Sequence, residues 1–232
     1  PRLSYPSLER SIAHSQMGDV CHHKSDHAGA FRHFSASNAD FAAIHENRTT
    51  GNLDNRAFVE ALLTGLAPID EGAWQKANGD QPAHAAQRHV FLIGYPRSGT
   101  TLVENILASL PGVAALEERP TLYDADIEFI AGNASQIAEG LKRFSELDAS
   151  DLAQYRKAYW DKVVASVVPA GSPCFVDMDP LKATRLPFIA RLFPDARILV
   201  MRRDPRDVVW SCFRTNFAMS SGTLEYTSLE RT

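Results

Sequence analysis

The chain has few cysteines, no long apolar run and no excess of basic residues. Its three cysteines, Cys21, Cys174 and Cys212, are far apart, so we expect reduced, buried thiols rather than a metal site. No stretch approaches the roughly 18–20 apolar residues of a membrane helix, and no basic-then-apolar leader opens the sequence. The net charge of −4 provides no broad basic surface. We therefore expect a cytoplasmic protein without a metal, a membrane span or a nucleic-acid partner.

The remaining composition is that of a globular chain. The sequence has 232 residues, 44% of them hydrophobic, which suffices for one medium domain and a smaller helical unit. Turn-prone residues at 77–82 predict a linker. We expect a helical segment over residues 1–85 and an α/β domain over residues 86–232.

Residues 8–44 predict two short helices, because apolar residues recur at helical spacing on both sides of a polar connector. Gly18, Ala30 and Phe34 have the spacing of the small, small and aromatic positions of a tetratricopeptide repeat, where paired helices cross closely. A single repeat cannot bury its own apolar face. We interpret the pair as the last repeat of an array that starts outside this chain; the alternative is an ordinary helical hairpin. A further helix is expected over residues 56–66.

From residue 89 onward, short apolar strands alternate with amphipathic helices. The strands are expected at 89–93, 174–176 and 197–201, and the main helices at 100–110, 152–167, 186–193 and 206–217. Continuous apolar strands of this kind are typical of buried parallel sheets. The pattern predicts an α/β fold with a P-loop-type parallel sheet that helices cover on both faces.

A glycine-bearing loop follows the first expected strand. Gly94 and Gly99 have the P-loop spacing, which turns backbone N–H groups toward a phosphate at the start of a helix. A nucleotide triphosphatase would have Lys at position 100. This chain has Thr100 there and a positive charge at Arg97 instead, which favours a single 5′-phosphate with an attached anionic group. The candidate phosphate ligands are Arg97, Ser98, Gly99, Thr100 and Thr101.

A second basic segment follows the last expected strand, at the edge where open α/β sheets bind ligands. Arg203 lies in this segment, and Ser211 lies two turns into the next expected helix. We predict that these two side chains hold a second phosphate. The alternative is a solvated Arg/Asp network at a helix start.

Together the two loops resemble the sulfotransferases that use 3′-phosphoadenosine 5′-phosphosulfate (PAPS). The likeness is closest to the tyrosylprotein sulfotransferase branch and to bacterial sulfotransferases fused to tetratricopeptide repeats. It implies that the first loop binds the 5′-phosphosulfate and that Arg203 and Ser211 bind the 3′-phosphate. It also implies that Glu118 is the general base and that Arg97 stabilises the leaving phosphate of the product, adenosine 3′,5′-bisphosphate (PAP). No metal is expected.

The sequence departs from this family at two points. Relatives usually read Asp-Lys-x-Pro after the second expected strand, whereas residues 177–180 read Asp-Met-Asp-Pro, so Met178 takes the place of the Lys. We predict that Lys182, one helical turn further on, supplies the missing charge, since losing such a donor costs about 10²–10³ in rate. Relatives also continue well beyond the 3′-phosphate site. The end at Thr232 therefore predicts a fragment without part of the cofactor lid and acceptor site.

The predicted function is transfer of a sulfuryl group from PAPS to a hydroxyl or amine acceptor. The acceptor can be a peptide or protein, a carbohydrate or a small molecule, and a tetratricopeptide groove would favour a peptide. Two alternatives stay open. Met178 favours a catalytically impaired protein that binds a nucleotide and a partner. A P-loop nucleotide kinase would instead show Mg²⁺-dependent ATP binding, which Thr100 disfavours.

Overall fold

The computed structural model describes residues 6–49, 53–74, 81–166, 168–218 and 220–232. These residues form two compact units. The α/β unit comprises residues 58–203, and the helical unit combines the residues up to 57 with residues 204–232. The units reflect packing within the chain, so the domain limits expected from the sequence, 1–85 and 86–232, stay a prediction. Residues 77–80 of the expected linker lie outside the described residues.

Four parallel strands form the centre of the α/β unit, in the order β2-β3-β1-β4. Their bounds are β1 (His89–Ile93), β2 (Val113–Glu117), β3 (Cys174–Met178) and β4 (Arg197–Val200). The α/β class with a parallel sheet is therefore confirmed. Because the strands are parallel, their carboxyl ends meet at one edge of the sheet, which we call the carboxyl edge.

Helix α4 (Thr100–Ala108) covers one face of the sheet. Leu92 and Met178 are fully buried on this face, and Val103 and Leu107 of α4 pack against them. The apolar positions of α4 recur at helical spacing, so one side of the helix faces the sheet.

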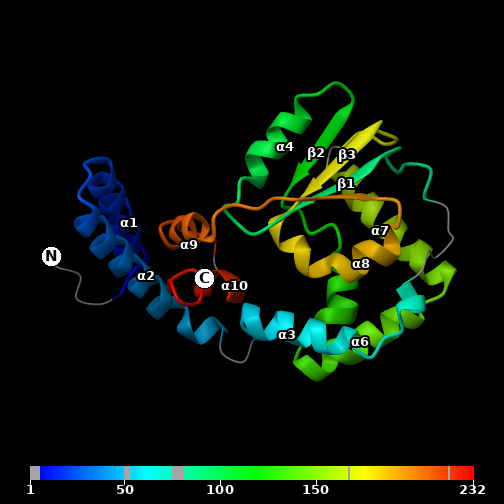
Figure 1. Cartoon of the computed structure of the whole chain (residues 1–232), viewed down its shortest axis with the longest axis horizontal. Coiled ribbons are helices and arrows are strands. Elements are labelled where there is room, and N and C mark those ends of the chain that lie inside the picture. Colours follow the sequence, from blue (N-terminus) through cyan, green and yellow to red (C-terminus); the bar gives the residue numbers. More distant parts are fainter. Residues whose placement is uncertain (1–5, 50–52, 75–80, 167, 219) are drawn as a thin grey trace. The chain divides into compact units, whose positions relative to one another are not determined.

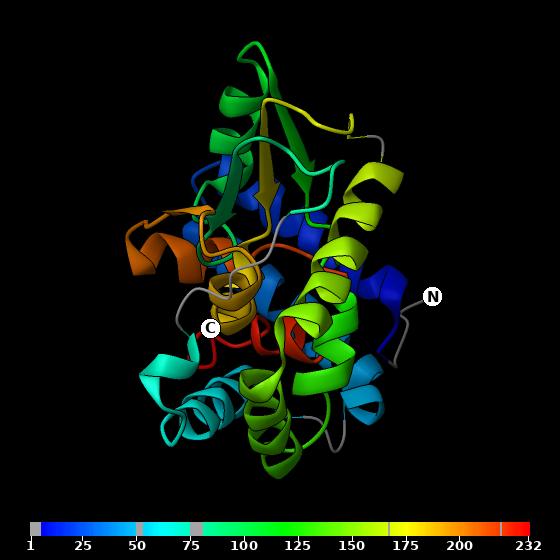
Figure 2. The same ribbon diagram turned by 90° about the vertical axis from the view of Figure 1, so that its right-hand side faces the viewer.

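Helices α7 (Ala149–Ala165) and α8 (Leu186–Leu192) lie on the opposite face (Figures 1 and 2). An aromatic cluster fills this layer: Phe91 of β1 and Phe175 of β3 pack against Trp160, Tyr159 and the nearby Phe193. Ring pairs of this kind contribute dispersion and edge-to-face interactions beyond simple area burial. The layer fixes the sheet to α7 and α8.

Strand β4 is less covered by helices than the other three strands. Ile198 and Leu199 are each 42% exposed, and Val200 is 60% exposed. The reason is the position of α4, which contacts β1, β2 and β3. Among the described residues, the apolar side chains of β4 therefore have little cover on either face.

The sequence reading missed β2, which pairs with β3 over its full length. Its centre, Ala114-Ala115, has low strand propensity, so the pairing with β3 determines its conformation. The other elements of the unit are the end of α3 (Asn55–Leu66), η1 (Glu71–Trp74), α5 (Tyr123–Ala125), η2 (Asp126–Ile130), α6 (Ala134–Glu146) and η3 (Pro180–Arg185).

The start of α6 is fixed by its sequence. Asn133 accepts a hydrogen bond from the Gln136 backbone, and the Gln136 side chain accepts one from the Asn133 backbone. This capping box satisfies two N–H groups that the helix leaves unpaired. Leu141 and Phe144 are then fully buried on one side of the helix.

The helical unit contains α1 (Leu8–His23), α2 (His27–Thr49), α9 (Pro205–Phe213) and α10 (Ser221–Glu225). Helix α9 ends at Phe213, before the expected end at 217. A Cβ on Gly18 would lie 2.6 Å from the Phe34 ring, so α1 and α2 cross closely there, as the spacing of small residues predicts. Whether the pair belongs to a tetratricopeptide array stays a prediction.

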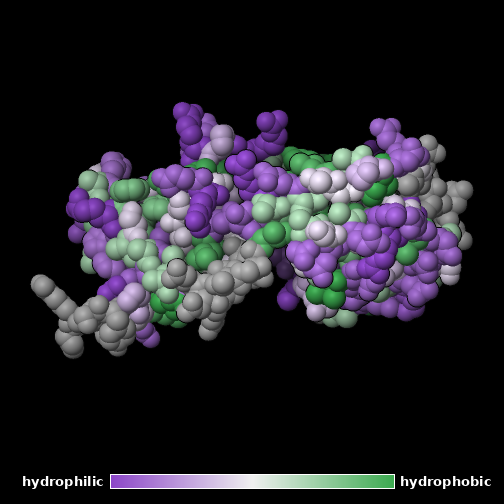
Figure 3. Space-filling model, turned by 90° about the horizontal axis from the view of Figure 1, so that it is seen from below, coloured by the Kyte–Doolittle hydropathy of each residue, from purple (hydrophilic) through white to green (hydrophobic). Residues whose placement is uncertain are grey.

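The face shown in Figure 3 carries mainly hydrophilic residues at its right-hand end, interrupted by separate hydrophobic ones. None of the described helices combines the length and the apolar character that crossing a membrane requires.

Candidate functional site

The segment from the end of β1 into the first turn of α4, residues 94–101, requires glycine at two positions. We call it the Gly94 loop. A Cβ on Gly94 would lie 2.9 Å from both the Met201 carbonyl oxygen and the Ser98 hydroxyl. Gly99 has a φ of +102°, which L side chains rarely adopt. The two glycines therefore let the loop pass close to the end of β4 and turn into α4.

The Gly94 loop leaves several polar groups available to a ligand. The Ser98 hydroxyl is buried and has no hydrogen-bond partner among the described residues. Helix α4 starts at Thr100, and its N-cap, Gly99, makes no side-chain capping bond. Unsatisfied N–H groups at a helix start attract anions. Thr100 is buried beneath the loop.

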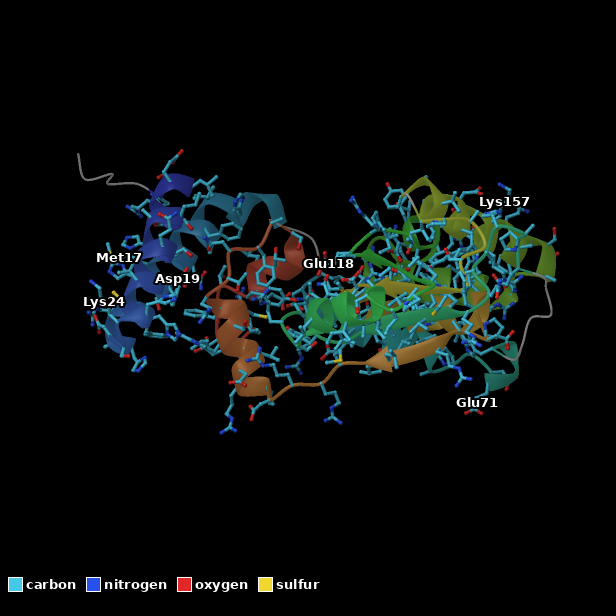
Figure 4. All side chains as sticks on the ribbon, turned by 90° about the horizontal axis from the view of Figure 1, so that it is seen from above. Met17, Asp19, Lys24, Glu71, Glu118 and Lys157 are labelled. Atoms are coloured by element: carbon cyan, nitrogen blue, oxygen red, sulfur yellow. The ribbon has the colours of Figure 1, made fainter. Side chains whose placement is uncertain are left out.

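Glu118 directly follows β2 and therefore lies at the carboxyl edge of the sheet, beside the Gly94 loop. Its backbone N–H donates to the Met178 carbonyl oxygen at 2.7 Å. The neighbouring Glu117 accepts a hydrogen bond from the Thr101 hydroxyl at 3.1 Å. Figure 4 shows Glu118 at one end of the α/β unit and Lys157 of α7 at the other.

Backbone strain is concentrated at this edge. Among the described non-glycine residues, only Ser25, Arg97 and Glu118 have positive φ, with φ of +68° at Arg97 and +47° at Glu118. Such a conformation costs on the order of 1–3 kcal/mol and persists where the surroundings impose it, often at active sites. Two of the three residues predicted to act in catalysis, Arg97 and Glu118, are thus held in a strained conformation.

The surroundings of Glu118 raise its pKa. Partial burial has the largest effect, and the nearby carboxylates of Asp179 and Glu117 add to it. The Arg97 charge opposes the shift, so the two predicted catalytic side chains are close enough to interact. A carboxylate whose pKa moves toward neutrality is better suited to take a proton from a weakly acidic group.

Arg203 follows β4 and contacts the Gly94 loop. Its guanidinium donates to the Arg97 carbonyl oxygen at 3.2 Å. Arg203 thereby connects the two loops that the sequence analysis identified. Ser211 lies on α9 in the helical unit, and its role beside Arg203 at a phosphate stays a prediction.

Lys182 and Met178 occupy interior positions. Lys182 is 3% exposed, and its ammonium donates to Asp177 Oδ1 at 2.5 Å and to the Arg119 carbonyl oxygen at 3.0 Å. Met178 is fully buried and packs against the apolar side of α4. The ammonium of Lys182 is therefore held below the segment that carries Glu118. Its catalytic role stays a prediction.

Asp177, Thr121 and Tyr159 are three site-supporting residues that the sequence analysis did not identify. Asp177 Oδ2 accepts hydrogen bonds from the Thr121 hydroxyl at 2.9 Å and from the Tyr159 hydroxyl at 2.7 Å. One signal was available: Asp177 is a charged residue in an otherwise apolar strand, and such a residue needs partners in the interior. The sequence did not indicate which partners these would be.

A cavity of about 310 Å³ opens at the opposite edge of the sheet, which we call the amino edge. Arg88, His89, Trp160 and Arg197 are among the residues that line it, and none of the predicted site residues does. No group of three or more His, Cys, Asp or Glu side chains that could hold a metal ion occurs in the described parts of the chain.

Similar sequences among known proteins indicate the family of the chain. The sequence model of the sulfotransferase family matches residues 89–232. An uncharacterized protein of Aquifex aeolicus is 30% identical over 149 residues, which cover 62% of this chain and 19% of that protein. Protein-tyrosine sulfotransferase 1 of Mus musculus is 31% identical over 163 residues, and that of Homo sapiens 30%; each alignment covers 68% of this chain and 43% of the relative.

The chain spans less than half the length of these curated relatives. The family match nevertheless covers more than half of this chain, and it contains the Gly94 loop, Glu118 and Arg203. On this evidence the chain belongs to the sulfotransferase family.

Proposed function

We propose that the protein transfers a sulfuryl group from PAPS to a hydroxyl or amine acceptor. The observation that carries the proposal is the presence of two strained, oppositely charged residues, Arg97 and Glu118, at the carboxyl edge of the sheet. Acceptor activation requires a base, and departure of a phosphate requires a cation. The two side chains supply one each.

The Gly94 loop fits the 5′-phosphosulfate end of PAPS. The Ser98 hydroxyl has no partner among the described residues, and the start of α4 has no side-chain cap, so both can donate to an anionic ligand. A Cβ at Gly94 would clash with the Met201 carbonyl oxygen and the Ser98 hydroxyl, so glycine there keeps the loop in the position from which its N–H groups would contact the ligand. Arg97 adds the positive charge that Lys supplies in nucleotide triphosphatases. Thr100 and Thr101 complete the proposed ligand set.

PAPS supplies the sulfuryl group of the proposed reaction. Glu118 takes the proton of the acceptor as the acceptor oxygen or nitrogen forms its bond to sulfur. Arg97 and the N–H groups of the Gly94 loop stabilise the charge that develops on the 5′-phosphate oxygen as its bond to sulfur breaks. PAP leaves, and the proton stays on Glu118 until solvent removes it.

The 3′-phosphate is assigned to Arg203 and Ser211. The hydrogen bond from Arg203 to the Arg97 backbone supports this assignment for Arg203, because it ties the second loop to the first. The assignment of Ser211 follows from the sequence resemblance. A direct role of Lys182 at the sulfur would require its ammonium to leave Asp177, so the proposed chemistry depends on Glu118 and Arg97.

The mammalian relatives suggest the first acceptor to test. Their names describe them as sulfotransferases of protein tyrosine. A tyrosine phenol in a peptide is therefore our leading candidate. Carbohydrates and small molecules are the other candidates. Peptide capture by the α1–α2 pair and a cytoplasmic location belong to the same proposal.

Met178 favours one alternative, a protein that binds the nucleotide without turnover. The family Lys at this position would place a charge at the carboxyl edge, whereas Met178 is buried in the apolar layer under α4. The alternative predicts PAP binding without sulfuryl transfer.

Isothermal titration calorimetry tests the nucleotide site. We would titrate PAP, and separately ATP with Mg²⁺, into the wild type, into Arg203→Ala, and into Arg88→Ala as a control at the amino edge. The wild type and Arg88→Ala should bind PAP with equal affinity. Arg203→Ala should bind it about 10- to 100-fold more weakly, because a hydrogen bond to a charged group contributes roughly 1.5–3 kcal/mol.

A transfer assay completes the test. Radiolabelled PAPS is incubated with the protein and a tyrosine-containing peptide, or with 4-nitrophenol as a simple phenol. Labelled acceptor supports the proposal. PAP binding without labelled acceptor, over a panel that also contains carbohydrates and amines, would favour the binding protein. Mg²⁺-dependent ATP binding without PAP binding would overturn the sulfotransferase assignment in favour of a kinase.

A further inference from the structure

A buried ion pair lies below the segment that carries Glu118. Asp177 is fully buried, Lys182 is 3% exposed, and the Lys182 ammonium lies 2.5 Å from Asp177 Oδ1. Burying two charges costs solvation energy that their attraction repays poorly, so stability alone does not explain such a pair. Its other hydrogen bonds indicate what it holds in place.

Two of those bonds reach residues 118–121, which we call the Glu118 loop. The Lys182 ammonium donates to the Arg119 carbonyl oxygen at 3.0 Å, and the Thr121 hydroxyl donates to Asp177 Oδ2 at 2.9 Å. The Glu118 N–H is itself bonded to the Met178 carbonyl oxygen. The loop is therefore fixed to β3 and η3 at its start, middle and end.

The positive φ of Glu118 explains why such fixing is needed. A Glu in the left-handed conformation relaxes to an ordinary backbone unless its neighbours prevent it. Glu118 is exposed, whereas Thr121 is 2% exposed. Buried Thr121, three residues further along the chain, and its partner Asp177 thus hold the segment that carries the strained residue.

We infer that Asp177, Lys182 and Thr121 are positioning residues that hold Glu118 in its reactive conformation, and that Lys182 acts through the Glu118 loop rather than on the sulfur. The inference rests on the proposed role of Glu118 as the base. It accounts for a lysine that lies one turn beyond the family position and points into the interior.

We call Asp177, Lys182 and Thr121 the clamp. The test uses Thr121→Val, which removes the hydroxyl of the clamp and leaves the Asp177–Lys182 ion pair intact. Thr121→Ser restores the hydroxyl. Ser172→Ala is the matched control: it removes another buried hydroxyl with one hydrogen bond, to the Pro169 carbonyl oxygen near the start of β3. Hydrogen–deuterium exchange of peptides spanning the Glu118 loop and the pH dependence of sulfuryl transfer are measured for each variant.

Thr121→Val should accelerate exchange in the Glu118 loop and lower kcat about 10-fold or more, because small misplacement of a catalytic group is costly. Affinity for PAP should stay at the wild-type value. The acid limb of the rate profile should move to lower pH, since a looser Glu118 gains water and moves away from Asp179 and Glu117, which raise its pKa. Thr121→Ser and Ser172→Ala should behave like the wild type.

Three results would overturn the inference: wild-type exchange and kcat in Thr121→Val, an equal loss of kcat in Ser172→Ala, or a loss of kcat in Lys182→Met with unchanged exchange of the Glu118 loop. The last result would mean that the ammonium acts on the reacting atoms. The exchange readout needs no turnover. Failure of the clamp and failure of the proposed function, seen as absent PAP binding in the wild type, are therefore distinguishable.

Discussion

The two ends of β1 lie only a few residues apart, but the polar groups at one end are packed among aromatic rings and those at the other end belong to a strained loop. At the amino edge, His89 lies within an aromatic cage that includes Phe91, Trp160 and Phe193. At the carboxyl edge, the Gly94 loop holds Arg97 in a strained backbone conformation. The neighbouring Ser98 hydroxyl has no hydrogen-bond partner among the described residues. One strand thus starts among packed aromatic rings and ends at a loop with a buried hydroxyl and an exposed guanidinium.

The difference is one of cost and use. Burial among rings forces His89 to stay neutral, and its pKa falls to about 3. Backbone strain and the Ser98 hydroxyl, which has no partner among the described residues, cost stability at the Gly94 loop and are useful only when an anion binds there. The amino edge therefore maintains the fold, and the carboxyl edge carries the proposed chemistry. Three substitutions test this contrast. For each of the first two, the same type of residue is replaced at or near the amino edge as a control.

Replacing Glu118 should have the largest effect. Glu118→Gln keeps the size of the side chain and removes the base, so kcat for sulfuryl transfer should fall by about 10²–10⁴-fold. PAP binding should persist, because the carboxylate has no role in holding the phosphates. Steady-state transfer assays and calorimetry measure the two quantities separately.

Asp195→Asn is the corresponding carboxylate change at the amino edge, where Asp195 lines the cavity. It should leave kcat unchanged. A Glu118→Gln enzyme with wild-type kcat, or an equal loss in both variants, would refute the functional division between the two edges.

The substitution Gly94→Ala should have the next largest effect, on the affinity for PAP. Gly94→Ala places a Cβ 2.9 Å from the Met201 carbonyl oxygen, a backbone atom that cannot move aside cheaply. The loop must shift, and PAP affinity should fall by about 10- to 100-fold as its N–H groups leave their positions. Calorimetric titration with PAP measures the change.

Gly171→Ala is the matched glycine change near the amino edge. Gly171 has a φ of +67° and open space where a Cβ would lie, so alanine there adds backbone strain of about 1–2 kcal/mol without a clash. Thermal unfolding should register this loss, and PAP affinity should not change. Equal PAP affinity in wild type and Gly94→Ala would show that the loop geometry is irrelevant to binding.

Local sequence patterns predicted much of the carboxyl edge. The run at 89–93, the glycine spacing at 94 and 99 and the helix start at Thr100 are local signals, and the structure contains all three elements. The position of Glu118 depends on β2, whose alanines carry no strand signal; only pairing with β3 produces it. The resemblance to known sulfotransferases therefore identified Glu118, and local propensity did not.

The sequence did not predict which residues far apart in the chain contact one another. The sequence predicts that Lys182 supplies the charge missing at position 178, but it does not indicate that the Lys182 ammonium is hydrogen-bonded to the buried carboxylate of Asp177. The partner on Arg119 lies 63 positions away in the sequence. Similarly, the exposure of β4 follows from where α4 packs, which the apolar pattern of residues 197–201 does not encode.

The smallest expected effect comes from a substitution at the amino edge, His89→Gln. It concerns the stability of the fold and depends on the protonation of His89. The Tyr159 hydroxyl donates its proton to Asp177, so His89 Nε2 must donate to the Tyr159 oxygen, at 2.7 Å. His89 Nδ1 is then the deprotonated nitrogen, and it is buried without a partner among the described residues. A proton there would find no acceptor. Burial, with a smaller contribution from the Lys182 charge, accordingly lowers the His89 pKa.

The lowered pKa predicts acid sensitivity of the fold. In the folded state His89 stays neutral down to about pH 3, whereas in the unfolded chain it takes up a proton below its ordinary pKa of 6.5. Stability is therefore full above pH 6.5 and falls as the pH drops, by about 1.5 kcal/mol between roughly pH 6.5 and 5. His89→Gln should lose this component. Denaturant titrations of both proteins across that range measure the difference, in which other titrating groups cancel; parallel pH profiles would show that the aromatic cage does not hold His89 neutral.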